Sequence, residues 1–205
     1  EIGTGNFSIV YLFEKRSDGT KYAAKFINTS DEITEEEAES LIRETTIHQS
    51  VNHPAIVKLI GCNFKTLKDL ENTEPIILTE YFQNGTLRKI LKKERKEKSD
   101  KNWNSTKKFI CLLGISDAMR YLHFHRIMHR DLKPDNILMD ENLYPHISDF
   151  GLSRCFNKSL SKSLNISMTN RLGTPLYMAP EMYENNMHYN QGVDVYSFGL
   201  IVYEI

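Results

Sequence analysis

The chain has 205 residues, 40% hydrophobic and 26% charged, which is typical of a globular protein and too apolar for a disordered one. Lys and Arg total 26 against 27 Asp and Glu, and a net charge of −1 provides no general attraction for nucleic acid or for anionic membranes. The three cysteines, Cys62, Cys111 and Cys155, are odd in number and far apart. This excludes a disulfide framework and favours reduced thiols in a cytoplasmic setting. Membrane insertion and secretion are not expected, because the sequence lacks a long apolar run and a signal-peptide pattern.

The first part of the chain, up to about Tyr81, indicates short strands with one helix. Apolar and aromatic residues on both sides of the turn-forming Ser17–Thr20 predict a hairpin. Thr34 and Glu37 have the spacing of a capping box, which begins a helix that should run to about Val51. The polar segment at 64–74 predicts a loop. The expected elements are strands at 11–13, 22–27, 56–62 and 76–81 and a helix at 34–51.

From Thr86 onward the sequence favours helices. The mixed-charge run at 92–101 indicates a solvated helix end followed by a loop. A helical period of apolar residues predicts a buried helix at 106–125. Its expected inward face consists of Phe109, Leu112, Leu113, Ser116, Met119 and Leu122. The segment at 194–205 is apolar, and the Ser-, Lys- and Asn-rich segment at 159–169 predicts a surface loop.

Lys25 is an unusual residue for its position in the second strand of the hairpin. Strand alternation places it on the same face as the apolar Ala23 and Ile27. A lysine there either extends into water from an edge strand or needs an anionic partner, because an unpaired buried charge is costly. Glu44 lies on the inward face of the predicted helix, so we expect it to pair with Lys25.

Five motifs follow one another along the chain. Gly3–Val10 is a glycine-containing loop between strands, a weak signal alone because glycines are common in hairpin turns. Lys25 follows, and then HRDLKPDN at His129–Asn136, DFG at Asp149–Gly151 and APE at Ala179–Glu181. These motifs, in this order, resemble the signature of the eukaryotic protein kinase family, and the likeness covers essentially the whole chain.

The resemblance implies a two-lobed α+β fold. A small, strand-rich lobe would occupy residues 1–81, and a helical lobe would occupy residues 82–205, with the chain ending inside the central helix of that lobe. ATP and Mg²⁺ would bind where the two lobes meet. In relatives Glu181 pairs with an arginine from later helices, so we expect these residues to be a marginally stable piece of a longer protein.

The resemblance also implies a role for each polar residue of the motifs. Asp131 would accept the proton of the attacking hydroxyl, and Lys133 would neutralise charge on the transferred phosphoryl group. Lys25, oriented by Glu44, would bind the α- and β-phosphates. The implied Mg²⁺ ligands are Asn136 and Asp149.

The nucleotide-binding residues implied by the family pattern lie in both predicted lobes. They are Ile2, Gly3, Gly5, Val10, Ala23, Lys25, Thr79, Glu80, Phe82 and Leu138. Thr79 would stand at the back of the adenine pocket, and residues 80–82 would form the hinge whose backbone binds the base. The apolar members of this set are equally typical of an ordinary core. Ser8 departs from the family pattern, which has a third glycine at that place.

The acceptor is expected to be a Ser or Thr hydroxyl of a protein substrate. Lys133, two residues after Asp131, is typical of Ser/Thr kinases, and the segments at 80–87 and 194–199 resemble the tyrosine-kinase-like group of those enzymes. Arg130 suggests control by phosphorylation of Ser167 or Thr169, by an upstream kinase or by the protein itself.

Two other functions remain open from the sequence. One is a non-catalytic pseudokinase that acts as a scaffold, which Ser8 favours and the intact Lys25, Asp131, Asn136 and Asp149 oppose. The other is a phosphotransferase for small molecules, which the APE motif and the long segment before it oppose.

Overall fold

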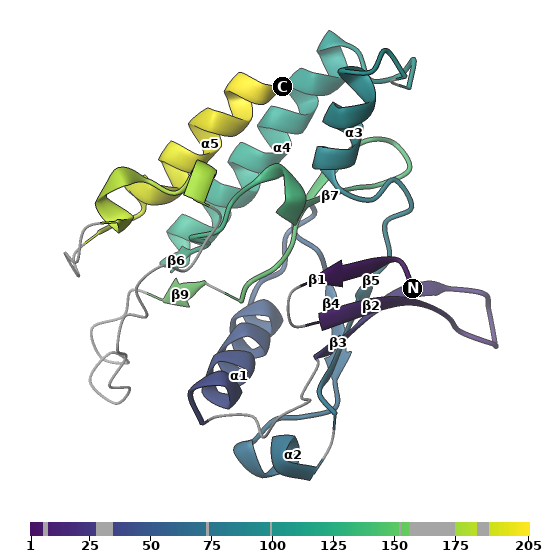
Figure 1. The fold of residues 1–205 in the computed structure, drawn as a ribbon, viewed down its shortest axis with the longest axis vertical. Coiled ribbons are helices and arrows are strands. Elements are labelled where there is room, and N and C mark those ends of the chain that lie inside the picture. The colour runs from purple at the N-terminus through teal and green to yellow at the C-terminus, as the bar shows by residue number, and fades with distance from the viewer. Residues whose placement is uncertain are drawn as a thin grey trace. The chain divides into compact units, whose positions relative to one another are not determined.

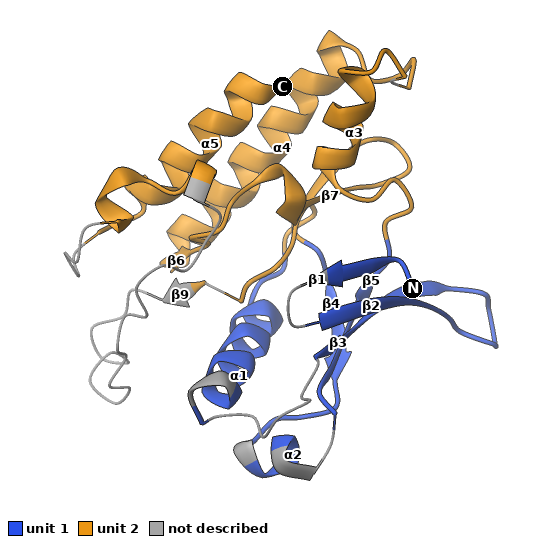
Figure 2. Cartoon of the chain, in the orientation of Figure 1, with its two compact units in different colours: residues 1–52, 57–81 blue, residues 53–56, 82–205 orange. Residues whose placement is uncertain are grey.

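The computed structural model describes residues 1–5, 8–27, 35–72, 74–98, 100–151, 153–155, 175–183 and 189–205. The chain forms two compact units (Figure 2). Unit 1 consists of Glu1–Asn52 and Val57–Tyr81, and unit 2 consists of His53–Ile56 and Phe82–Ile205. The chain therefore enters unit 2 for four residues at His53, returns to unit 1, and leaves it after Tyr81.

Unit 1 contains an antiparallel sheet with the strand order β1-β2-β3-β5-β4 (Figure 1). Its strands are β1 (Gly3–Gly5), β2 (Ser8–Glu14), β3 (Lys21–Ile27), β4 (Leu59–Cys62) and β5 (Ile76–Glu80). The predicted hairpin is confirmed as β2 and β3, and Asp18 in its turn accepts hydrogen bonds from Thr20 N–H and Lys15. The strand expected at 56–62 begins only at Leu59, because Ile56 is buried in unit 2, where it forms a bridge with Ile147.

Two helices accompany the sheet of unit 1. The helix predicted at 34–51 is confirmed as α1 (Glu35–Ser50), while Thr34 lies outside the described residues. The loop predicted at 64–74 was wrong in part, because α2 (Leu67–Asn72) forms there. Phe64 and Leu70 are buried in one cluster with Ala38 of α1 and Ile77 of β5, which ties this polar segment to the core. Asp69 accepts the N–H groups of residues 65 and 66 and so caps the short helix.

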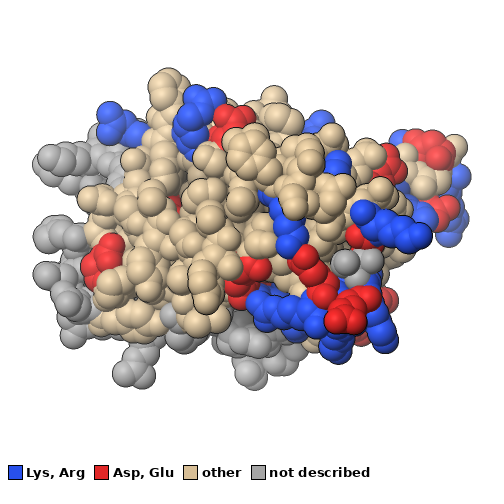
Figure 3. Space-filling model, turned by 90° about the horizontal axis from the view of Figure 1, so that it is seen from above, with Lys and Arg blue, Asp and Glu red and all other residues tan. Residues whose placement is uncertain are grey.

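The described part of unit 2 is built around α3 (Leu87–Glu94), α4 (Ser105–Phe124) and α5 (Gly192–Glu204), with α4 and α5 side by side (Figure 1). Thr86 and Asn104 cap the first turns of α3 and α4. Both predicted long helices are confirmed. The described residues of the run, 92–98 and 100–101, form the end of α3 and the following loop, as predicted. Basic and acidic side chains are interspersed on the face that Figure 3 shows.

The predicted inward face of α4 was wrong at three positions. Phe109 and Leu113 are 62% and 53% exposed, respectively, and Ser116 is also exposed. The buried stripe of α4 instead consists of Cys111, Ile115, Ala118, Met119 and Leu122. Apolar residues occur on both sides of this helix, so its period alone fits two orientations, and the packing of unit 2 selects one of them.

Short strands and 3₁₀ turns complete the described part of unit 2, and the strands flank the segment His129–Asn136. β6 (Ile127–Met128) pairs with β9 (Arg154–Cys155), and β7 (Ile137–Met139) pairs with β8 (Pro145–Ile147). Three single turns of 3₁₀ helix are η1 (Pro134–Asn136), η2 (Pro175–Tyr177) and η3 (Pro180–Met182). The segment His129–Asn136 thus lies between two strand pairs.

Candidate active site

The pairing of Lys25 with Glu44 is confirmed within unit 1. Lys25 of β3 lies with its Nζ atom 3.2 Å from Oε1 of Glu44, which is buried on α1. The Lys25 side chain remains 30% exposed. A lysine ammonium held in place by a buried carboxylate is suited to binding a phosphate.

The sheet of unit 1 gathers most of the predicted nucleotide-binding residues on one face. Val10 is paired with both Gly3 and Lys25, and Ala23 is paired with Thr79. Directly opposed residues share a face, as do residues two apart on one strand. Gly3, Val10, Ala23 and Thr79 therefore lie on the same face as Lys25. The backbone of Ile2 continues this hairpin, since its N–H donates to the carbonyl of Val10 at 2.8 Å.

The predicted hinge residues have defined partners in each unit. In unit 1, the Glu80 carboxylate accepts the N–H of Lys58 at 2.7 Å, which anchors the end of β5. In unit 2, the ring of Phe82 lies 4.3 Å from that of His146, and Leu138 is paired with His146 across the β7–β8 hairpin. Convergence of these residues on one adenine ring stays a prediction.

Unit 2 brings the predicted catalytic residues together around Asp131. Lys133 Nζ donates to Oδ2 of Asp131 at 2.6 Å, and Asn136 Nδ2 donates to the same oxygen at 2.9 Å. Asn136 Nδ2 also donates to the Asp131 backbone carbonyl at 2.8 Å. The carboxylate is therefore oriented by the cation that immediately precedes η1 and by an amide within η1.

Asp149 is tied to this group through its neighbour Ser148. The N–H and the hydroxyl of Ser148 donate to the carbonyl of Asn136 at 2.8 and 3.0 Å. Asp149 itself has a left-handed backbone with φ +65°, as does Arg130 with φ +67°. Such conformations are unfavourable for residues other than glycine and cluster at functional sites, where surrounding contacts enforce them.

Asp194 on α5, a residue given no role from the sequence, provides such contacts for Arg130. It is buried and accepts the N–H groups of His129 at 3.0 Å and Arg130 at 2.8 Å. His123 Nε2 lies 2.8 Å from the same carboxylate. The available signal was a carboxylate near the start of a largely apolar helix, which implies a buried partner.

The protein kinase domain model of the family matches residues 1–205. The chain belongs to the protein kinase family. It is 36% identical to a PR5-like receptor kinase of Arabidopsis thaliana, 35% identical to a putative serine/threonine-protein kinase receptor of Brassica oleracea var. viridis, and 33% identical to a probable serine/threonine-protein kinase of Dictyostelium discoideum. Each match covers 100% of this chain but only 29%, 22% and 20% of the relative, respectively. The chain thus spans less than a third of the length of these relatives.

The kinase residues predicted to hold Mg²⁺ have suitable chemistry. Asn136 and Asp149 offer amide and carboxylate oxygens, the hard donors that Mg²⁺ prefers. Because Asn136 donates through Nδ2 to Asp131, its Oδ1 points away, and among the described residues no hydrogen bond takes that oxygen. The described residues contain no cluster of three His, Cys, Asp or Glu side chains that could hold a metal.

Several predicted features of the kinase domain are either outside the described residues or differ from the expectation. Ser167 and Thr169 lie outside the described residues. Glu181 is exposed rather than buried, so the stability penalty expected for an unpaired buried carboxylate does not arise in this structure. None of the helices that the structure describes is long and apolar enough to cross a membrane.

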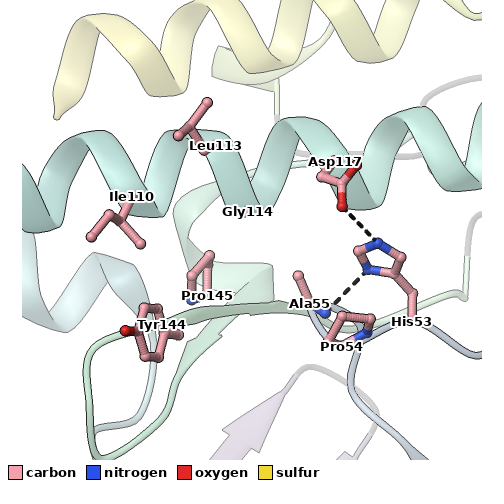
Figure 4. A pocket seen from close by; sticks show the side chains of 9 residues that line it. All are labelled: His53, Pro54, Ala55, Ile110, Leu113, Gly114, Asp117, Tyr144 and Pro145. Atoms are coloured by element: carbon pink, nitrogen blue, oxygen red, sulfur yellow. Dashed lines mark hydrogen bonds and ion pairs between the residues drawn. The ribbon is translucent and has the colours of Figure 1, made fainter.

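A pocket of about 530 Å³ lies in unit 2 (Figure 4). α4 lines one side of it, and residues 53–55 and 144–145 line the other. His53 closes one end, with Nε2 at 3.1 Å from Asp117 and Nδ1 accepting the N–H of Ala55. None of the lining residues is among those predicted to bind nucleotide, metal or substrate.

Proposed function

We propose that this kinase domain transfers the γ-phosphoryl group of ATP to Ser or Thr hydroxyls of protein substrates. The observation that carries the proposal is the group around Asp131, in which Lys133 and Asn136 bind the same carboxylate oxygen. A carboxylate held in this way can accept the proton of an alcohol, and a lysine beside it can balance the negative charge of a phosphoryl group.

The remaining residues would bind and orient the nucleotide. Lys25, held by Glu44, would bind phosphate oxygens from unit 1. Asn136 and Asp149 would hold Mg²⁺, which when bound neutralises charge on the phosphates. The face of the sheet that contains Val10, Ala23 and Thr79 would receive the adenine, and Leu138 of unit 2 is likewise proposed to bind it.

The choice of Ser and Thr rests on Lys133 and on the relatives. Lys133 is the residue type that Ser/Thr kinases have at this place, and two of the relatives are named as serine/threonine-protein kinases. Phosphoamino-acid analysis of a phosphorylated protein substrate would test this choice, and phosphotyrosine as the main product would contradict it.

Transfer of labelled γ-phosphate to a generic protein substrate tests the proposed reaction. Asp131→Asn should lower the rate by about 10²- to 10⁴-fold, because the amide cannot accept the proton. Glu141→Gln makes the same type of change at an exposed position of the β7–β8 turn and should leave the rate unchanged. Equal rates for wild type and Asp131→Asn would refute the assigned role, and nucleotide binding without any transfer by wild type would favour a pseudokinase scaffold.

Control by phosphorylation is part of the same proposal. Arg130 is buried and its Nη1 donates to the Tyr189 hydroxyl at 2.9 Å, so this guanidinium already lies among polar groups of unit 2. A phosphate on Ser167 or Thr169 would supply a stronger acceptor for it. Replacing both hydroxyl residues with alanine should lower activity, and full activity in that variant would rule out this control.

A further inference from the structure

Arg88 of α3 joins three other elements of unit 2. Its Nε donates to Oδ2 of Asp135 at 3.0 Å, and its Nη1 donates to both carboxylate oxygens of Glu204 at 3.0 and 2.9 Å. Its Nη2 donates to the hydroxyl of Tyr177. All three nitrogens of the guanidinium therefore have partners, on η1, α5 and η2. The side chain is only 15% exposed.

The electrostatics agree with this geometry. Burial alone would lower the pKa of Arg88, but its hydrogen bonds to Tyr177, Glu204 and Asp135 raise it well above the usual range. Burial alone would raise the pKa of Glu204, but hydrogen bonds from Tyr177 and Arg88 lower it. The cluster is thus held as an ionic group, with charge-assisted bonds that are stronger than neutral ones.

Asp135 connects this cluster to the predicted catalytic group. It is the middle residue of η1, between Pro134 and Asn136, and Lys133 immediately precedes the turn. Within the turn, the N–H of Asn136 donates to the carbonyl of Lys133 at 2.9 Å. A single 3₁₀ turn has little internal hydrogen bonding, so contacts from outside determine how it is oriented. The Arg88–Asp135 ion pair is such a contact.

We propose that Arg88 is a positioning residue that acts through Asp135 on η1 and so places Lys133 and Asn136 at the Asp131 carboxylate. This inference rests on the proposed phosphoryl transfer for its effect on rate. The planar fork of arginine is essential to the role, because a lysine has a single nitrogen and cannot bind Asp135, Glu204 and Tyr177 in the same geometry. The competing explanation is that the cluster only stabilises unit 2, and the experiments below separate the two.

A double-mutant cycle measures the coupling between Arg88 and Asp135. Arg88→Ala should lower kcat by about 10- to 100-fold, because small displacements of catalytic groups have effects of that size, while KM for ATP stays within about twofold. Asp135→Asn should lower kcat in the same direction. The double variant should lose no more than Arg88→Ala alone, because both changes break one connection. Arg88→Lys should also fall short of the wild-type kcat.

Arg95→Ala is the matched control. Arg95 also contacts Glu204, at 3.5 Å, but its side chain is largely exposed and does not reach η1. This variant should retain the wild-type kcat. A purely structural role for Arg88 predicts a lower melting temperature with unchanged kcat below the transition, or losses that add in the double variant, and either result overturns the proposal. If Arg88→Ala does not fold, the kcat values of Arg88→Lys and Asp135→Asn below the melting transition decide between the positioning role and the purely structural role.

Amide hydrogen exchange gives a readout that does not depend on activity. Arg88→Ala and Asp135→Asn should speed exchange in the peptide covering 133–137, while the core of α4 at 111–122 exchanges as in wild type. Unchanged exchange at 133–137 overturns the proposal even if wild type proves inactive. Absence of phosphoryl transfer by wild type, by contrast, refutes the proposed function. In that case the exchange result alone tests whether Arg88 positions η1.

Discussion

Replacing Asp194 with alanine should destabilise unit 2 and disorganise the predicted catalytic segment. The substitution removes the acceptor of two backbone N–H groups, those of His129 and Arg130, both of which lie in buried residues. Each orphaned buried donor costs about 1–3 kcal/mol, and part of this cost is offset because a buried carboxylate no longer has to be desolvated. We expect a net loss of about 3 kcal/mol, which is a large fraction of the 5–15 kcal/mol typical of a folded domain.

Urea denaturation measures this loss directly. Asp194→Ala should shift the midpoint to lower urea with an unchanged slope, and Asp194→Asn should lose about half as much because its amide oxygen still accepts one bond. Glu141→Gln, at an exposed position, should stay within about 0.5 kcal/mol of wild type. A loss below about 1 kcal/mol for Asp194→Ala would refute the claim that this carboxylate holds the backbone at 129–130.

Two further predictions concern packing and pH. Gly114→Ala should lower the melting temperature, because a Cβ there would lie 2.7 Å from Cγ of Pro145, and the cost of overpacking of about 1–3 kcal/mol exceeds the gain in helix propensity. Gly199→Ala should raise the melting temperature, because a Cβ there meets no atom within 4 Å. A higher melting temperature for Gly114→Ala than for Gly199→Ala would contradict this. The lowered pKa of Glu204 stabilises the protein at neutral pH, and this contribution is lost as pH falls through the folded-state pKa. Melting temperatures measured toward acid should therefore fall less steeply for Glu204→Gln than for wild type, and parallel curves would contradict the assignment.

The elements that could be predicted from sequence are those whose signals are local. The β2–β3 hairpin is defined by its turn chemistry and by alternation of apolar residues, and the structure has the expected pairing. The Lys25–Glu44 ion pair was also accessible, because the strand pattern and the helix pattern each placed one member on an inward face. The grouping of Lys133 and Asn136 at Asp131 lies within six residues of chain, so the motif itself contains it.

The features that sequence reasoning missed depend on contacts between distant segments. The polar composition of the segment that contains α2 gave no signal for a helix. The burial of Phe64 and Leu70 against Ala38, which ties this segment to the core, is visible only in the structure. Likewise, the exposed position of Phe109 on α4 follows from which side of the helix the rest of unit 2 covers. Periodicity shows that a helix has an apolar side but does not choose between two such sides.

The polar side chains of α5 explain how a helix without any predicted catalytic residue supports the candidate site. Asp194 near its start binds the backbone at 129–130, Ser197 donates to the carbonyl of Tyr177 at 2.8 Å, and Glu204 at its end binds Arg88. The rest of this helix is largely apolar, and burying a polar group there is costly unless it has a partner. Each of these three side chains has one, on a different element. The partners of Asp194 and Glu204 lie 64 to 116 residues away in sequence, so α5 acts as a scaffold that fixes the predicted catalytic segment from both ends. Substitutions at these positions should therefore reduce activity, although none of the three is proposed to touch the substrate.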